Sequence, residues 1–164
     1  IITDIIKLLG CGVEVKTKAN KELSMFHLDG LRWNKIVICT DADVDGFQIR
    51  TLILTMLYRL TPTLIENGYV YIAEYTEKEK VEILQKIGKE PATLQRSKGL
   101  GENEADMMAL TTMNPETRRL IRVTPAGVEE TAAMFDLLLG DDLQGRKQFI
   151  AEYGHAYLEL ADIS

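Results

Sequence analysis

The sequence predicts an α/β fold, in which a small parallel sheet lies between helices and a helical tail follows. Residues 36–40 and 69–73 are short, continuous apolar runs, the pattern of parallel strands that are buried on both faces. Between them, apolar side chains recur at helical spacing over residues 49–60, which predicts a helix that faces the core. A strand, a helix and a second strand in this order predict a right-handed βαβ unit.

Further elements are expected around this unit. Residues 2–9 carry apolar side chains at helical spacing, so they predict an amphipathic helix that ends at Gly10. Residues 12–31 are mixed and polar, and we expect a connection rich in loops. Pro62 should end the long helix, because its ring is excluded from a helix interior, and begin a short helix that runs to Asn67.

The second half of the chain has a different character. Residues 77–87 predict a charged amphipathic helix, and residues 92–95 are a possible strand. Asn114-Pro115 should open a short helical stretch, residues 120–123 predict a strand, and residues 129–139 predict a helix. We therefore expect two parts, a core and a tail region packed on it, with the boundary at residues 1–74 and 75–164.

Composition narrows the class of protein. The 164 residues are 46% hydrophobic and 27% charged, which is typical of a soluble globular domain. No run approaches the roughly 18 apolar residues of a membrane span, and no export leader is visible. Cys11 and Cys39 lack metal-type spacing and are expected to be buried, reduced thiols of a cytosolic protein. The chain starts with Ile1 and not with methionine, which favours a piece of a longer protein.

The most informative stretch follows the first predicted strand and reads Asp41-Ala42-Asp43-Val44-Asp45-Gly46. Side chains of extended backbone alternate, so Asp41, Asp43 and Asp45 could converge on one side of the chain. Three such carboxylates repel one another unless a cation or a proton is present. Hard oxygen ligands suit Mg²⁺, and Mn²⁺ or Ca²⁺ can substitute for it. The placement at the carboxyl end of a strand, where open α/β sheets bind ligands, favours a metal site over a solvated turn.

Two other families place aspartates in this way. A calcium-binding helix-loop-helix needs a glutamate at the twelfth loop position, which here is Leu52, so this alternative fails. A phosphotransferase of the haloacid-dehalogenase type would use Asp41 as the nucleophile and Asp43 as the general acid. It would also need Asp141-Asp142 as a second acidic motif, and that pair ends a predicted helix where the family has a strand.

A glycine-bearing turn supplies the other candidate binding residues. The net charge of −6 would weigh against nucleic-acid binding, yet basic residues remain in small clusters. Arg96 and Lys98 flank the turn Lys98-Gly99-Leu100-Gly101, whose glycines let backbone amides approach an anion. When such a turn is taken alone, an ordinary surface loop is the better interpretation.

Several motifs together carry a resemblance. They occur in order along nearly the whole chain: Thr40 to Gly46, Ile49-Arg50-Thr51-Leu52, Gly68-Tyr69-Val70-Tyr71-Ile72-Ala73, Lys98-Gly99-Leu100-Gly101-Glu102, Thr111 to Arg119, and Leu139-Gly140-Asp141 with Arg146 and Phe149-Ile150. The sequence resembles the Toprim domain and C-terminal tail of the B subunit of bacterial type IIA topoisomerases, DNA gyrase and topoisomerase IV. A small Rossmann-like parallel sheet flanked by helices is the fold that this implies.

The resemblance implies a function. In that family an A subunit supplies the tyrosine that attacks duplex DNA, an upstream domain hydrolyses ATP, and the enzyme is an A₂B₂ heterotetramer in the bacterial cytoplasm, associated with the nucleoid. Asp41 and Asp43 would be catalytic ligands of Mg²⁺, Asp45 a supporting acid, and Arg96 and Lys98 contacts to DNA.

Three departures from the family accompany it. The family's catalytic glutamate lies in an upstream Glu-Gly motif that this chain does not contain. Gln48 stands where the family usually has histidine, and a Pro-Leu-Tyr segment with its hairpin is missing between Glu74 and Tyr75. Without the glutamate, the chain could instead be a non-catalytic module that docks DNA and the A subunit.

Overall fold

The structure is a computed structural model and describes residues 1–41, 43–73, 100–102 and 105–160. In chain order the first part comprises α1 (Ile2–Leu9), the 3₁₀ turns η1 (Lys18–Asn20) and η2 (Leu28–Gly30), β1 (Ile36–Ile38), α2 (Val44–Leu60), α3 (Pro62–Glu66) and β2 (Val70–Ala73). The later part comprises the 3₁₀ turn η3 (Leu100–Glu102), α5 (Ala105–Met108), the π-helical η4 (Ala109–Met113), β3 (Leu120–Arg122), α6 (Val128–Leu139), α7 (Leu143–Tyr153) and η5 (Gly154–Leu160).

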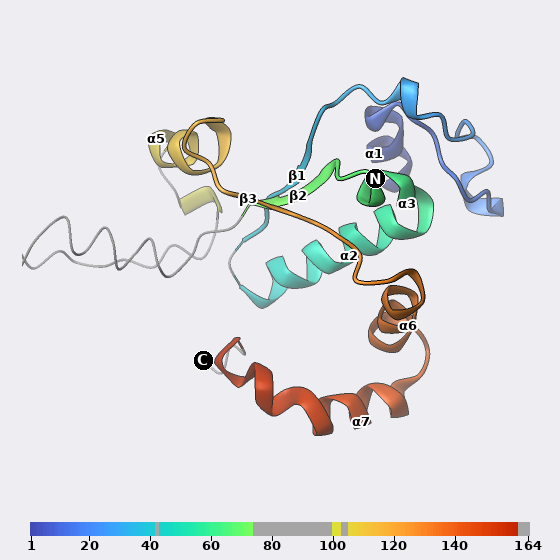
Figure 1. The fold of residues 1–164 in the computed structure, drawn as a ribbon, viewed down its shortest axis with the longest axis vertical. Coiled ribbons are helices and arrows are strands. Elements are labelled where there is room, and N and C mark those ends of the chain that lie inside the picture. The colour runs from blue at the N-terminus through green and yellow to red at the C-terminus, as the bar shows by residue number, and fades with distance from the viewer. Residues whose placement is uncertain (42, 74–99, 103–104, 161–164) are drawn as a thin grey trace, which may run out of the picture.

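The described strands form one sheet in the order β1-β2-β3 (Figure 1). β1 and β2 are parallel, with Ile36 opposite Val70, so the predicted strand-helix-strand unit is confirmed. β3 was predicted as a strand without a direction, and it runs antiparallel to β2 with Leu120 opposite Ala73. The sheet is therefore mixed around one parallel pair.

The N-terminal helix matches its prediction. Ile6 and Leu9 of α1 are buried, and the helix ends at Gly10, whose φ of 85° is the left-handed conformation that glycine adopts without steric cost. At the far end of α2, Thr61 is fully buried and its hydroxyl donates to the Leu57 carbonyl, after which α3 starts at Pro62.

The apolar stripe of α2 is only partly directed at the core, which corrects the prediction. Leu57 is 1% exposed, whereas Ile49 and Leu52 are 51% and 50% exposed. In Figure 1, α1 and α3 lie near the C-terminal end of α2, and Leu57 packs in one core with their buried residues, whereas Ile49 and Leu52 belong to the N-terminal half of the helix. Helical spacing identifies a face but does not say how much of its length is covered.

The main core lies around α1, β1, β2 and the end of α2. Its most deeply buried large side chains are Ile6, Val13, Leu57, Leu64 and Val70. Within the described part of the chain, no helix is both long and apolar enough to cross a membrane.

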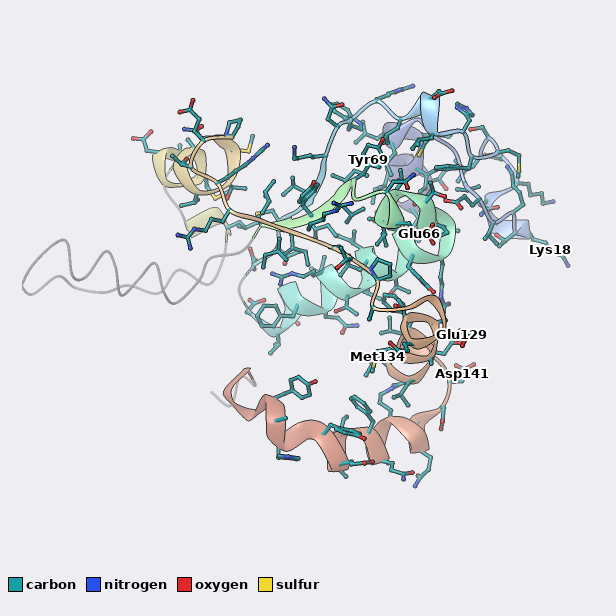
Figure 2. All side chains as sticks on the ribbon, viewed as in Figure 1. Lys18, Glu66, Tyr69, Glu129, Met134 and Asp141 are labelled. Atoms are coloured by element: carbon teal, nitrogen blue, oxygen red, sulfur yellow. The ribbon has the colours of Figure 1, made fainter. Side chains whose placement is uncertain are left out.

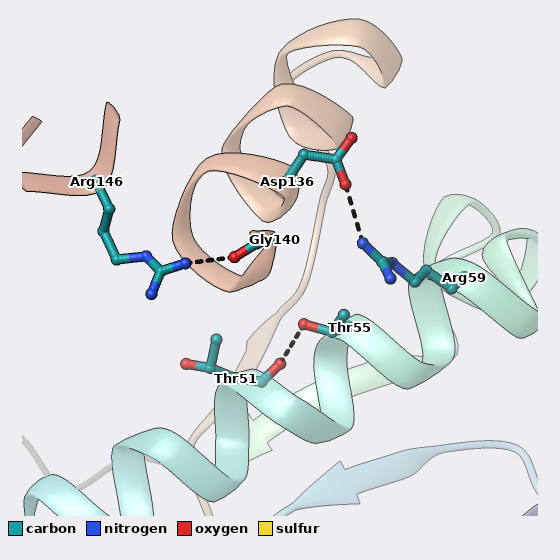
Figure 3. A network of polar contacts seen from close by, with 6 residues as sticks. All are labelled: Thr51, Thr55, Arg59, Asp136, Gly140 and Arg146. Carbon is teal, nitrogen blue, oxygen red and sulfur yellow. Dashed lines mark hydrogen bonds and ion pairs between the residues drawn. The ribbon is translucent and has the colours of Figure 1, made fainter. Parts of the chain in front are cut away.

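The later part of the chain reaches α2 through α6. The Arg59 guanidinium lies 2.9 Å from an Asp136 carboxylate oxygen (Figure 3). The rings of Tyr58 and Phe135 are 5.1 Å apart between centroids. Arg146 of α7 donates to the Gly140 carbonyl and so ties α7 to the end of α6 (Figure 3).

Several predictions for this part can be compared with the structure. The helix predicted at residues 129–139 is confirmed as α6. The stretch expected after Asn114 is a single turn, in which the Asn114 carbonyl accepts from the Arg118 amide. α5, η4 and α7 were not predicted. The helix and strand expected at residues 77–87 and 92–95 lie outside the described residues.

Candidate metal site

Asp41 lies just past the end of β1 and is partly buried. Its Oδ1 accepts a hydrogen bond from the backbone amide of Leu100, at 2.7 Å. This contact joins residues 59 positions apart in the chain, so the turn that begins at Leu100 returns to the end of β1. A carboxylate has two oxygens with about four acceptor positions, so one amide leaves it with capacity for a cation.

Asp43 is the N-cap of α2. Its backbone is extended, with φ of −132° and ψ of −179°, and its Oδ1 accepts from the Gly46 amide at 2.8 Å. Aspartate is a favoured N-cap because its carboxylate satisfies an amide that has no partner in the helix and complements the helix dipole. The carboxylate of Asp43 is thus held in place by the helix that it starts.

Gly46 allows the loop and the helix to approach each other closely. A Cβ added to this buried residue would collide with the backbone carbonyl of Asp41. The motif therefore requires glycine at this position for steric reasons, independently of any ligand.

Asp45 departs from the expectation of three alternating carboxylates. α2 begins at Val44, so Asp45 is an exposed residue in the first turn of a helix and not part of an extended chain. Among the described residues, no group of three or more His, Cys, Asp or Glu side chains is arranged to hold a metal. The prediction of extended backbone through Asp45 is wrong, because Asp43 caps a helix that already begins at Val44.

The residues beside the loop are polar and partly buried. Burial raises the pKa of the Cys39 thiol, a hydrogen bond with Thr112 and the positive charge of Arg50 oppose this shift, and the Asp41 carboxylate adds to it. The buried Thr40 Oγ1 and Arg50 Nε have no hydrogen-bond partner among the described residues. The guanidinium of Arg50 also lies over the Phe47 ring, 5.3 Å from its centroid.

The donor chemistry fits a small divalent cation held by two carboxylates. Mg²⁺ keeps several water ligands and is commonly bound by one or two carboxylates together with substrate phosphate. Asp41 and Asp43 each offer a second carboxylate oxygen besides the one that accepts from a backbone amide, and these amides orient both carboxylates. The assignment of Asp41, Asp43 and Asp45 as catalytic and metal-binding residues remains a prediction.

The second acidic motif of the dehalogenase-type alternative lies elsewhere. Asp142 caps α7, with its Oδ1 accepting from the Gly145 amide at 2.8 Å. Figure 2 shows Asp141 at the end of α6, which contacts the C-terminal part of α2 through Asp136 and Arg59. The acidic loop, which contains Asp41 and Asp43, is at the N-terminal end of α2. The described structure thus does not bring the two acidic motifs together.

Sequence reasoning only partly identified the glycine-bearing turn. Arg96 and Lys98, the predicted DNA contacts, lie outside the described residues. The glycines were taken to let amides approach an anion, and the Leu100 amide does bind one, the chain's own Asp41. Thr112, which influences the Cys39 thiol, lies in the motif Thr111 to Arg119, but nothing in the sequence indicated that it is close to Cys39.

Two protein families match this chain. The Toprim domain family matches residues 2–75, and the family described as DNA gyrase B subunit, carboxyl terminus, matches residues 89–151.

Individual relatives agree with these matches. The DNA gyrase B subunit of Thermotoga maritima is 38% identical over 174 residues, covering 97% of this chain and 26% of the relative. The DNA gyrase B subunit of Thermus thermophilus is 38% identical over 171 residues, covering 95% of this chain and 26% of the relative. The DNA gyrase B subunit of Clostridium acetobutylicum is 42% identical over 144 residues, covering 77% of this chain and 23% of the relative. The chain thus spans about a quarter of the length of these relatives.

The alignment with the Thermotoga relative also bears on the segment that is predicted to be missing between Glu74 and Tyr75. Its alignment extends over 174 positions although the chain has 164 residues, so the relative has residues without a counterpart here. This agrees with a missing segment in the chain, and its location between Glu74 and Tyr75 stays a prediction.

Proposed function

Since this chain belongs to the DNA gyrase B family, through a Toprim domain and that family's carboxyl-terminal region, we propose that it provides the metal-binding part of a type IIA topoisomerase's DNA cleavage centre. The observation that carries this proposal is the pair Asp41 and Asp43 at the carboxyl end of β1, each oriented by a backbone amide. Backbone donors fix both carboxylates without neutralising them, as a cation site requires.

Each acidic residue has a distinct part in the proposal. Asp41 and Asp43 bind the cation directly, and Asp45, exposed in the first turn of α2, acts through water. A bound Mg²⁺ supplies charge neutralisation at the phosphodiester during cleavage and religation. Arg96 and Lys98 are proposed to contact DNA phosphate.

Other chains and segments complete the reaction. We propose that the nucleophilic tyrosine belongs to an A subunit, and that the acid-base glutamate and the ATPase belong to upstream parts of the same B subunit, in an A₂B₂ enzyme. Within this chain, residues 1–74 form the Toprim core and residues 75–164 the tail region. The contacts of α6 with α2 support the packing of the tail on the core.

A second candidate function is a docking module without metal. It is favoured by one observation, that no group of three potential ligands occurs among the described residues. On this alternative the acidic loop would only shape the start of α2.

Calorimetric titration of the chain with Mg²⁺ separates the two candidates. We expect weak binding that is lost in the double variant Asp41→Asn/Asp43→Asn, because both changes remove charge from ligand oxygens. Asp142→Asn is the matched control, since Asp142 caps α7 as Asp43 caps α2 and should leave Mg²⁺ binding unchanged. Equal binding by the double variant and the unmodified chain would exclude this site, and no binding at all would favour the docking module.

A further inference from the structure

The segment from Leu100 to Met113 contacts the end of β1 at two points. The Leu100 amide donates to Asp41 at 2.7 Å. Burial raises the pKa of the Cys39 thiol, and a hydrogen bond with the Thr112 side chain opposes this shift. Thr112 is 7% exposed, so its contact is made within the packed part of the molecule. Cys39 and Asp41 flank Thr40, so both contacts lie where β1 leads into the acidic loop, and both come from a segment more than 50 residues later in the chain.

The Leu100 amide is well suited to bind an acidic side chain. Leu100 is the first residue of the 3₁₀ turn η3, and the first amides of such a turn have no partner within the turn. A hydrogen bond to an ionised acceptor is shorter and stronger than one between neutral groups, and the 2.7 Å distance is in the range of charge-assisted bonds.

We propose that the backbone amide of Leu100 is a positioning group for the metal site: it holds the Asp41 carboxylate in the orientation in which Asp41 binds its cation. The proposal rests on the metal role proposed above for Asp41. On this proposal a site in the Toprim region depends on the tail region, since the donor that orients its first carboxylate comes from residue 100.

The chemistry of outer partners supports this role. Ligating carboxylates are usually hydrogen-bonded by a second residue that fixes their orientation, and the loss of such a partner weakens metal binding. With Oδ1 engaged by the amide, the carboxylate cannot rotate freely about its terminal torsion. Because the donor is a backbone group, the side chain at position 100 contributes nothing to this contact, so only the loss of the N–H should matter.

The hydrogen bond can be observed directly in the isotope-labelled chain. We expect a scalar coupling between the Leu100 amide nitrogen and the Asp41 carboxylate carbon, and an upfield shift of the Leu100 amide proton in Asp41→Asn. Asp43→Asn is the matched control: it should shift the Gly46 amide and leave Leu100 unchanged, because Asp43 accepts from Gly46. A Leu100 amide that is insensitive to Asp41→Asn would overturn the proposal.

The consequence for metal binding is tested with Mn²⁺, whose paramagnetic broadening of nearby amide signals reports weak affinity. Leu100→Pro removes the donor, and its ring is tolerated at the first position of a helical turn. We expect about tenfold weaker Mn²⁺ binding for Leu100→Pro and unchanged binding for Leu100→Ala, which keeps the amide.

The outcomes separate this inference from the proposed function. If Asp41→Asn binds Mn²⁺ as the unmodified chain does, the proposed function fails. If Asp41→Asn weakens binding and a folded Leu100→Pro does not, only the positioning role fails. Should Leu100→Pro not fold, a Leu100 amide that is insensitive to Asp41→Asn still overturns the positioning role.

Discussion

Gly46 illustrates how a single residue shapes the acidic loop. Gly46→Ala places a methyl group against the Asp41 carbonyl, so the loop must move or the chain loses stability. We expect the free energy of unfolding to fall by about 1–3 kcal/mol, the usual cost of overpacking. Gly101→Ala is the control, because a Cβ there meets no atom within 4 Å. Denaturant unfolding measures both variants, and equal stabilities would show that the close approach is not real.

The two cysteines give the stability a defined pH dependence. Burial is the main cause that raises the pKa of both the Cys11 and Cys39 thiols. Above the ordinary thiol pKa of about 8.5 the unfolded chain ionises while the folded chain stays protonated, so stability should be full below that pH and fall as pH rises further. Unfolding of Cys11→Ala, followed from about pH 7 to 10, should show a shallower fall. A stability that rises over this range would contradict the assignment.

At this scale the sequence indicated which aspartates to propose as ligands but not their hydrogen-bond partners. Asp41 and Asp43 could be chosen as candidate site residues because their spacing after an apolar run is local information. Asp45 was expected in extended backbone, but it is helical, because Asp43 caps a helix that begins at Val44. The Leu100 donor could not be predicted, since a backbone amide has no residue type to recognise and its acceptor is 59 positions away.

The helix α2 depends on Asp43 in a way that can be separated from metal binding. Asp43→Ala removes the cap and should cost about 1 kcal/mol of stability, and Asp43→Asn, which keeps a capping oxygen, should cost less. Asp142→Ala removes the equivalent cap of α7 and should cost a similar amount without affecting Mg²⁺ binding. Thermal unfolding and Mg²⁺ titration of the three variants measure this. If Asp142→Ala also lost Mg²⁺ binding, the loss of a helix cap alone would explain the weaker Mg²⁺ binding of Asp43→Ala, without a role for Asp43 as a ligand.

The ion pair between α2 and α6 should contribute little. Arg59 and Asp136 are 55% and 75% exposed, and solvent screening limits such pairs to about 0–1 kcal/mol. A double-mutant cycle with Arg59→Ala and Asp136→Ala should therefore give a small coupling energy that decreases in salt. A coupling energy of several kcal/mol would show that the pair, and not the Tyr58–Phe135 contact, holds α6 on α2.

Elements with strong periodicity were predictable and those defined by distant contacts were not. β1, β2, α1, α2 and α6 follow from apolar runs or helical stripes. The antiparallel direction of β3 depends on its pairing with β2, and the exposure of Ile49 and Leu52 depends on which elements cover α2. α7 carries apolar residues that remain exposed, Leu143 and Ile150 among them, so its sequence lacks a clear buried face.

The whole molecule is expected to be inactive by itself. DNA cleavage needs a nucleophile, a group that moves protons and a cation held against the phosphate, and this chain is proposed to supply only the ligands of the last. We expect that the isolated chain neither relaxes nor cleaves supercoiled plasmid in Mg²⁺. Robust relaxation by the isolated chain would overturn the proposed division of labour between subunits.

The central claim, that Asp41 and Asp43 serve DNA cleavage, is tested most directly in the complete B subunit carrying this chain, assembled with its A subunit. The measurement is the Mg²⁺-dependent cleavage of supercoiled plasmid by the unmodified enzyme and by Asp41→Ala, Asp43→Ala and the control Asp142→Ala. We expect cleavage to be abolished in the first two variants while subunit association persists, and to be retained in the control. Cleavage at the unmodified rate by both Asp41→Ala and Asp43→Ala would contradict the claim.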